Sequence, residues 1–285
     1  MKKVIVICGP TASGKTALSL QLAKYYQLDI INGDSVQIFQ GYDIGSAKIK
    51  VHEQQDIKHH LLSILPSNKT YDVAQYQHDV RDIINKKKVS MIVGGTGLYI
   101  KAALYDYRFS NDIKTNDITS FPDALTMYHE ILTFDPKAII DIHNTKRLQR
   151  NYLKVLSGQK PSENNFKHDP LYDVFTIYLD IPKTELKERL YIRLENQLNE
   201  GFIEEVKQLK SIGQVKDVIG YREINQYLDG EMSLDEAKHL IIKKSLAFAK
   251  RQRTWFLNQM NPFVIDATSE HLKETCIKEI NAWIK

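Results

Sequence analysis

The sequence predicts an α/β fold in which a doubly wound parallel sheet is flanked by helices. Three observations support this prediction. Short apolar runs alternate with helical segments along the 285 residues. The first run leads directly into a glycine-rich loop that opens a helix. One stretch near the middle of the chain breaks the alternation and has only helical periodicity, which indicates an insertion in the core.

The expected elements follow in chain order. A first strand is expected over Lys3–Cys8, where a continuous apolar run is typical of a buried parallel strand, and a helix is expected from about Lys15 to Tyr26. Later strands are expected at Leu28–Ile31, Val89–Val93, Val174–Leu179 and Phe263–Asp266. Ligands bind at the carboxyl ends of such strands, so the site is expected there.

Two helices carry clusters of basic residues. The core is predicted to comprise residues 1–112 and 168–285, with a helical insertion at 113–167. A helix from about Lys146 to Leu156 ends this insertion and carries basic residues on one stripe. A long helix is expected from about Ser233 to Gln259, because Ser233 and Glu236 form a capping-box pattern.

Composition indicates a globular protein, with 42% hydrophobic and 26% charged residues. No apolar stretch approaches the length of a membrane span and the start runs into a strand, so neither a membrane segment nor a signal peptide is expected. Cys8 and Cys276 are far apart in sequence, and Cys8 falls in an expected buried strand. Free thiols and a cytoplasmic location are therefore expected.

The distribution of charge says more than the net charge of +4. Neither the stretch 142–162 nor the stretch 237–265 contains an aspartate or glutamate, although each carries five or more lysines and arginines. Two such blocks in a nearly neutral protein indicate a surface that binds a polyanion.

The strongest motif is the phosphate loop G-x-x-x-x-G-K-[ST], which follows a strand and opens a helix as the motif requires. Its residues are Gly9, Pro10, Thr11, Ala12, Ser13, Gly14, Lys15 and Thr16. Lys15 offers a charge to a phosphate and Thr16 a hydroxyl to Mg²⁺. The strand Val89–Val93 ends in glycines rather than in the second acid that motor and switch NTPases use, which disfavours those classes.

Three further residues have a functional and a structural interpretation. Asp34, at the end of a strand, is either a general base or Mg²⁺ contact, or a residue that forms a turn. Thr96 could donate to a phosphate or cap a helix. Arg222, after a glycine turn, could bind phosphate or form a surface ion pair.

The segment from Lys250 to Phe256 interleaves basic and aromatic residues, a mixture that RNA-binding proteins use. It equally fits a solvated basic face with Trp255 and Phe256 in the core. The nine histidines show no metal-ligand spacing.

Taken together, the motifs resemble the bacterial tRNA dimethylallyltransferases over nearly the whole chain. Besides the phosphate loop, the motifs are Asp34-Ser35, Tyr42–Lys48, Gly94–Tyr99, Arg147–Arg150, Gly201–Val206, Gly220–Arg222 and Arg251–Phe256. The resemblance implies a P-loop kinase-like core, a helical insertion, and transfer of a dimethylallyl group from its pyrophosphate to the N6 amine of the adenosine 3′ of the anticodon.

The resemblance also implies roles for single residues. Asp34 would be the general base. The phosphate loop, Thr96 and Arg222 would hold the pyrophosphate, and Thr16 would contact Mg²⁺. Residues that would face the tRNA anticodon stem-loop are Ser35, Val36, Gln37, Lys146, Arg147, Arg150, Gly220, Tyr221, Lys250, Arg251, Gln252 and Arg253.

Two other functions remain open from the residues alone. The phosphate loop by itself would favour a kinase of a small metabolite, and the basic blocks would also fit an RNA-binding module without catalysis. The protein is expected to act as a monomer.

Overall fold

The chain forms two compact units. The computed structural model describes residues 1–107, 120–164 and 169–285. Unit 1 comprises Met1–Asp106 and Pro170–Lys285, and unit 2 comprises Tyr107–Asp169. The boundaries expected between residues 112 and 113 and between 167 and 168 lie outside the described residues.

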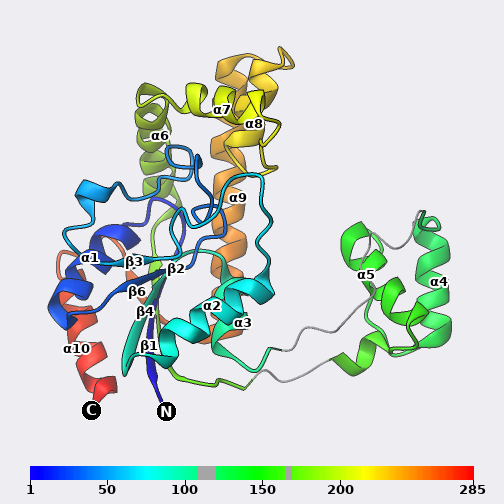
Figure 1. Ribbon diagram of the computed structural model, residues 1–285, viewed down its shortest axis with the longest axis horizontal. Coiled ribbons are helices and arrows are strands. Elements are labelled where there is room, and N and C mark those ends of the chain that lie inside the picture. Colours follow the sequence, from blue (N-terminus) through cyan, green and yellow to red (C-terminus); the bar gives the residue numbers. More distant parts are fainter. Residues whose placement is uncertain (108–119, 165–168) are drawn as a thin grey trace. The chain divides into compact units, whose positions relative to one another are not determined.

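Unit 1 is built on one sheet in which every neighbouring pair of strands is parallel, as the sequence predicts (Figure 1). The strand order is β3-β2-β4-β1-β5-β6. The strands are β1 (Lys3–Cys8), β2 (Ile30–Asn32), β3 (His59–His60), β4 (Val89–Val93), β5 (Asp173–Asp180) and β6 (Phe263–Asp266). The edge strand β3 has only two residues, both histidine, so it lacks the apolar run by which the other strands were predicted.

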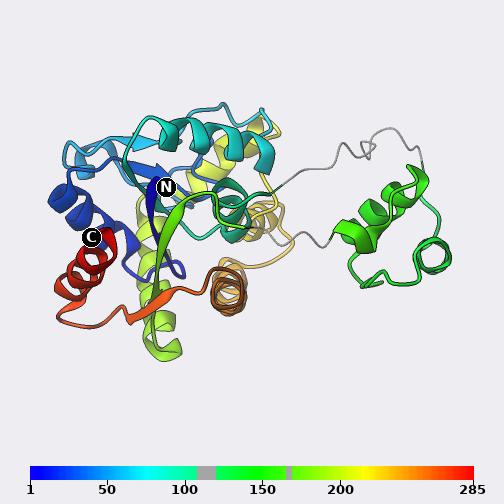
Figure 2. The ribbon, with the colours of Figure 1, turned by 90° about the horizontal axis from the view of Figure 1, so that it is seen from below.

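Helices cover both faces of this sheet (Figure 2). Ile5 and Ile7 of β1 pack with α1 (Lys15–Tyr26) and α10 (Leu272–Ile284) on one face. The alternate residues, Val4 and Val6, join the core of the other face. That core includes side chains of α2 (Val73–Asn85), α3 (Gly97–Leu104) and α9 (Leu234–Met260). Because side chains alternate along a strand, one apolar run supplies both cores.

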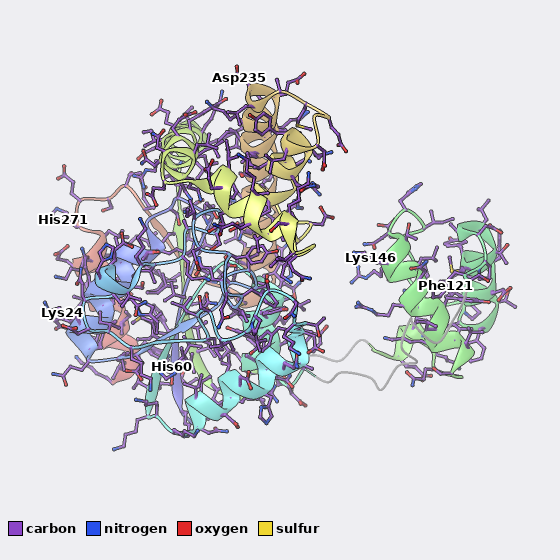
Figure 3. The ribbon with its side chains drawn as sticks, turned by 45° about the horizontal axis from the view of Figure 1, so that its top comes forward. Lys24, His60, Phe121, Lys146, Asp235 and His271 are labelled. Carbon is purple, nitrogen blue, oxygen red and sulfur yellow. The ribbon has the colours of Figure 1, made fainter. Side chains whose placement is uncertain are left out.

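The helix α9 borders the carboxyl edge of the sheet, together with α6 (Lys183–Asn199), α7 (Phe202–Ser211) and α8 (Tyr221–Leu228). It begins as the capping-box pattern predicts. The Glu236 amide donates to Ser233 Oγ at 3.2 Å, and the Ser233 amide donates to the Glu236 carboxylate at 2.8 Å. Asp235 lies in this first turn (Figure 3), where its charge complements the helix dipole.

Unit 2 has a small core of its own. The helices α4 (Ala124–Phe134) and α5 (Thr145–Leu156) pack through Met127, Ile131 and Leu148. A short 3₁₀ helix, Pro161–Asn164, follows. The expected helix at Lys146–Leu156 is thus present and begins one residue earlier. Its N-cap is Asn144, whose side chain accepts from the Arg147 amide at 3.1 Å.

The cysteines and the helices agree with the expectations from composition. Cys8 and Cys276 are both buried and both free. Within the described ranges, the helices are too short or too polar to cross a lipid bilayer.

Candidate active site

A cavity of about 860 Å³ lies in unit 1, over the carboxyl ends of the strands. Segments that are far apart in the sequence line it. These are Thr11–Ala12 and Gly14–Ala17, Asp34–Gln37, Gly45–Ala47, Val93–Thr96, Asp217–Arg222 and parts of α6 and α9. The structure therefore brings together the phosphate loop, Asp34, Thr96 and Arg222, which the sequence singled out separately.

The phosphate loop has the backbone that anion binding requires. Gly14 lies at the N-cap of α1 with φ of +87°, a left-handed conformation that glycine adopts without a steric penalty. The helix then presents its first amides and its positive end at the cavity. Lys15 Nζ folds back and donates to the carbonyls of Gly9 at 3.0 Å and Pro10 at 2.7 Å.

Besides the exposed Arg251, two partly buried cations of the cavity wall have no carboxylate ion pair within the described residues. One is Lys15, and the other is Arg193 of α6, whose Nη2 donates to the Ser46 carbonyl at 3.3 Å. Burial and the nearby Arg193 guanidinium lower the pKa of Lys15 to about 8. Burial likewise lowers the pKa of Arg193, an effect that Asp34 opposes. Such a pair favours a ligand with several negative charges.

Asp34 follows β2 and is held by Asn32. The Asp34 amide donates to Asn32 Oδ1 at 3.0 Å, and Asn32 Nδ2 donates to the Asp34 carbonyl at 2.9 Å. Asp34 Oδ1 accepts from the Val36 amide at 2.8 Å, so this residue does form the turn that one interpretation expected. Its Oδ2 has no hydrogen-bond partner within the described residues, which leaves one carboxylate oxygen for a ligand.

The glycine-rich turn after β4 brings Thr96 against Asp34 and Ser35. The Thr96 amide donates to the Gly33 carbonyl at 3.0 Å, and the Ser35 amide donates to Thr96 Oγ1 at 3.1 Å. Thr96 is the N-cap residue of α3, but its side chain makes no capping bond to that helix. Its hydroxyl instead joins two loops of the cavity wall.

Arg222 is engaged with carboxylates. Its Nη1 lies 2.7 Å from Asp217, and its Nη2 lies 2.9 Å from Glu223, which has no exposed side-chain surface. Lys244 of α9 contacts the same Glu223 oxygen at 2.8 Å. Burial alone would raise the pKa of Glu223, but hydrogen bonds from Lys244, the Gly220 amide and Arg222 hold it below the usual value.

A latch formed by Glu205 of α7 explains the motif Tyr42–Lys48. The Glu205 carboxylate accepts from the amides of Asp43 at 2.9 Å, Ile44 at 2.7 Å and Gly45 at 3.0 Å, and from the Tyr221 hydroxyl at 2.6 Å. One carboxylate thus ties a cavity loop to the residue beside Arg222. Positioning of the site, rather than contact with a ligand, accounts for much of this motif.

The predicted RNA-facing residues divide into three groups. Ser35–Gln37, Gly220, Tyr221, Arg251 and Gln252 line the cavity. Lys250 and Arg253 line a second groove of about 1130 Å³ between α6 and α9, where Arg253 pairs with Asp180 at 2.9 Å. Lys146, Arg147 and Arg150 are exposed on α5 of unit 2 (Figure 3 labels Lys146).

The basic and aromatic segment of α9 has both an exposed basic face and aromatic side chains packed in the core. Phe256 is fully buried and Trp255 packs against the core, whereas Lys250, Arg251 and Arg253 are exposed. Arg193 and Asn32 were missed by sequence reasoning. A sequence signal for Arg193 existed: it stands four residues after Arg189, on the helix that follows β5. In the structure both arginines line the cavity.

Among the described residues, no group of three or more His, Cys, Asp or Glu side chains could hold a metal ion. Thr16, which is exposed, and Asp34 line the same cavity, and each offers a side-chain oxygen. This sparse set fits Mg²⁺, which keeps several waters and is bound mainly by substrate phosphates.

The fold and the cavity define a P-loop α/β protein. The chain belongs to the IPP transferase family, because the model of that family matches residues 37–259. A second model, of the isopentenyl transferases, matches residues 2–66.

Relatives and solved structures agree with this assignment. The tRNA dimethylallyltransferase of Acholeplasma laidlawii is 47% identical over 100% of this chain and 99% of its own. That of Bacillus subtilis is 38% identical over 97% of this chain and 95% of its own.

The crystal structure of the tRNA isopentenylpyrophosphate transferase of Bacillus halodurans aligns with 100% of this chain and 96% of its own chain. The sequence identity is 30% and the TM-score is 0.75. A eukaryotic dimethylallyltransferase described as acting on tRNA matches 100% of this chain and 80% of its own, with 25% identity and a TM-score of 0.85.

Proposed function

We propose that this protein transfers a dimethylallyl group from dimethylallyl pyrophosphate to the N6 amine of the adenosine 3′ of a tRNA anticodon. The observation that carries the proposal is the cavity itself. Its phosphate loop and unpaired cations suit a diphosphate, and the free oxygen of Asp34 suits an amine. The names of the relatives support tRNA as the acceptor and a dimethylallyl group as the group transferred.

The diphosphate is the leaving group. The backbone N–H groups of the phosphate loop that line the cavity, Lys15 and Arg193 hold it, and Thr96 contributes its hydroxyl. Arg222 joins them by exchanging Asp217, which is 79% exposed, for the diphosphate. Negative charge grows on the diphosphate as the C–O bond breaks, so donors that are already in place lower the barrier.

The amine is the nucleophile. N6 attacks the first carbon of the dimethylallyl group, the bond from that carbon to the diphosphate oxygen breaks, and the Asp34 carboxylate takes one proton from N6. The Thr16 hydroxyl would hold Mg²⁺, which when bound would supply positive charge to the departing diphosphate. The adenine must leave the anticodon-loop stack to enter the cavity.

RNA binding involves both units. In unit 1, the residues at Ser35–Gln37, Gly220–Tyr221 and Lys250–Arg253 contact the anticodon stem-loop. In the helical segment 113–167, the exposed Lys146, Arg147 and Arg150 bind phosphates. The protein works as a monomer in the cytoplasm, where its tRNA substrate is found.

One assay tests the proposal against both alternatives. The protein is incubated with unmodified tRNA, Mg²⁺ and radiolabelled dimethylallyl pyrophosphate, and label in the RNA is counted. Label at N6 of one adenosine is the expected result. ATP consumption with a small acceptor would indicate a kinase instead, and tight RNA binding without either reaction would indicate a binding module.

A further inference from the structure

Gln252 lies in the middle of α9 and on the wall of the cavity. It is 7% exposed, and its Nε2 donates to the Gly95 carbonyl at 2.8 Å. The turn after β4 is shaped around α9. A Cβ added to Gly95 would lie 2.4 Å from Gln252 Nε2, and one added to Gly97 would lie 2.3 Å from the Trp255 ring. Close approach to α9 therefore explains two of the glycines in this turn.

The other half of the same amide has no partner. Gln252 Oε1 is buried and makes no hydrogen bond within the described residues. Turning the amide over would bring this oxygen against the Gly95 carbonyl, two acceptors facing each other. The bond to Gly95 therefore fixes the orientation of the amide and leaves its carbonyl oxygen as an acceptor without a partner among the described residues.

Gln252 and Asp34 are connected through the turn that follows β4. Gly95 precedes Thr96, whose amide donates to Gly33 and whose hydroxyl accepts from the Ser35 amide. A Cβ on Gly94 would lie 2.2 Å from the Gly33 carbonyl. Gln252 and Asp34 are thus held on two sides of one packed turn, and both line the same cavity.

Of the groups that react here, only the amine can donate to Gln252. A fully ionised diphosphate is an acceptor and a dimethylallyl chain has no polar hydrogen, whereas the N6 amine of adenine carries two N–H bonds. We propose that Gln252 selects adenine, its fixed carbonyl accepting one N6 proton while Asp34 receives the other. This inference rests on the proposed function.

The arrangement has a consequence for the reaction. Two acceptors hold both N–H bonds in the plane of the base, which leaves the face of the nitrogen open to the allylic carbon. The N–C bond forms as the C–O bond of the donor breaks, one proton passes to Asp34, and the remaining N–H stays on Gln252 in the product. Guanine would present an oxygen to this acceptor and is therefore disfavoured.

The test is a thermodynamic cycle in which the Gln252 side chain and the amine of the base are removed separately and together. Two stem-loop RNAs carry either adenine or purine, which lacks the amine, at the reactive position, and the Kd of each is measured with wild type and with Gln252→Met. Wild type is expected to prefer adenine about tenfold. The variant is expected to lose part of this preference, because Asp34 still accepts the other N6 proton, and its affinity should fall more for the adenine RNA than for the purine RNA.

Several outcomes would overturn the inference. A variant that keeps the full wild-type preference, or that weakens the binding of both RNAs equally, would mean a structural role. Equal binding of both RNAs by wild type would also exclude it, even where the variant does not fold. The matched control is Gln259→Met, an exposed glutamine on the same helix that bonds Lys101. Failure of the proposed function is distinguishable, because wild type would then transfer no label to RNA.

Discussion

Two groups of cations, of which Lys15, Arg193 and Arg222 line the cavity, differ in their partners. Lys15 and Arg193, the unpaired cations, contact only carbonyl oxygens. Arg222 and Lys244, the paired cations, share the buried carboxylate of Glu223. Burial, and in second place repulsion from Arg193, lower the pKa of Lys15 to about 8. The second pair already have carboxylate partners, since Arg222 also pairs with Asp217.

This difference indicates how the work is divided. An anion that enters beside the unpaired cations relieves repulsion and supplies missing partners, so its binding is favoured from the start. Arg222 must first give up an existing ion pair. Sequence motifs single out Arg222 and Lys15, but only the contacts show which cation is ready for a ligand.

The largest effect is expected from removing the carboxylate of Asp34. Asp34→Ala should lower kcat about a thousandfold, because it removes the group that takes the amine proton. Affinity for the tRNA should remain within about threefold of wild type, since the exposed basic residues that bind phosphates are untouched. Single-turnover transfer and filter binding measure the two quantities. Unchanged turnover would remove Asp34 from the role of base.

The second prediction compares the two groups directly. Arg193→Ala should lower kcat/KM for the prenyl donor about a hundredfold, as loss of one preorganised donor does. Arg222→Ala should cost less, about tenfold, because part of its charge is already used by Glu223. Steady-state kinetics on both variants checks the order, and a larger loss for Arg222→Ala would reverse the assignment.

The third prediction concerns the latch that holds the loop beside Arg193. Glu205→Ala removes an acceptor of three amides and one hydroxyl, and should lower the free energy of unfolding by about 2 kcal/mol. The matched control is Glu204→Ala, one residue away and exposed, with a partner 3.8 Å distant. Urea unfolding of both variants measures the difference, and equal losses would argue against the latch.

The fourth prediction is a pH dependence. Lys15 is charged below its pKa of about 8, so the affinity for diphosphate should fall by up to about tenfold between pH 8 and 9. The lowered pKa also means that charged Lys15 costs folding stability below pH 8, a cost that fades as the pH rises toward the ordinary lysine value. In Lys15→Arg the cation stays charged, so calorimetric titrations in the same buffers should show the dependence only in wild type.

Much of the fold was predictable because apolar runs mark buried parallel strands. The runs at Lys3–Cys8 and Val89–Val93 are strands over the same residues, whereas β3 has no apolar signal. The phosphate loop and Asp34 could be found because strand ends place polar residues at one edge of the sheet. Arg193 could not be found in this way, since it lies in mid-helix and reaches the cavity only through packing of α6.

The paired state of Arg222 also lies beyond the sequence. Asp217 and Glu223 are close to Arg222 along the chain, but Lys244 is 21 residues beyond Glu223, and the burial of Glu223 depends on how α8 and α9 pack. The same holds for Gln252, whose single free acceptor follows from its approach to Gly95.

The most direct measurement is a crystal structure of the protein with a stem-loop RNA and a non-reactive thio analogue of dimethylallyl pyrophosphate. The account predicts the diphosphate within hydrogen-bond distance of Lys15 and Arg193, and an extruded adenine whose amine contacts Asp34. A nucleoside triphosphate bound productively in the loop, or an RNA whose adenine stays stacked outside the cavity, would contradict it.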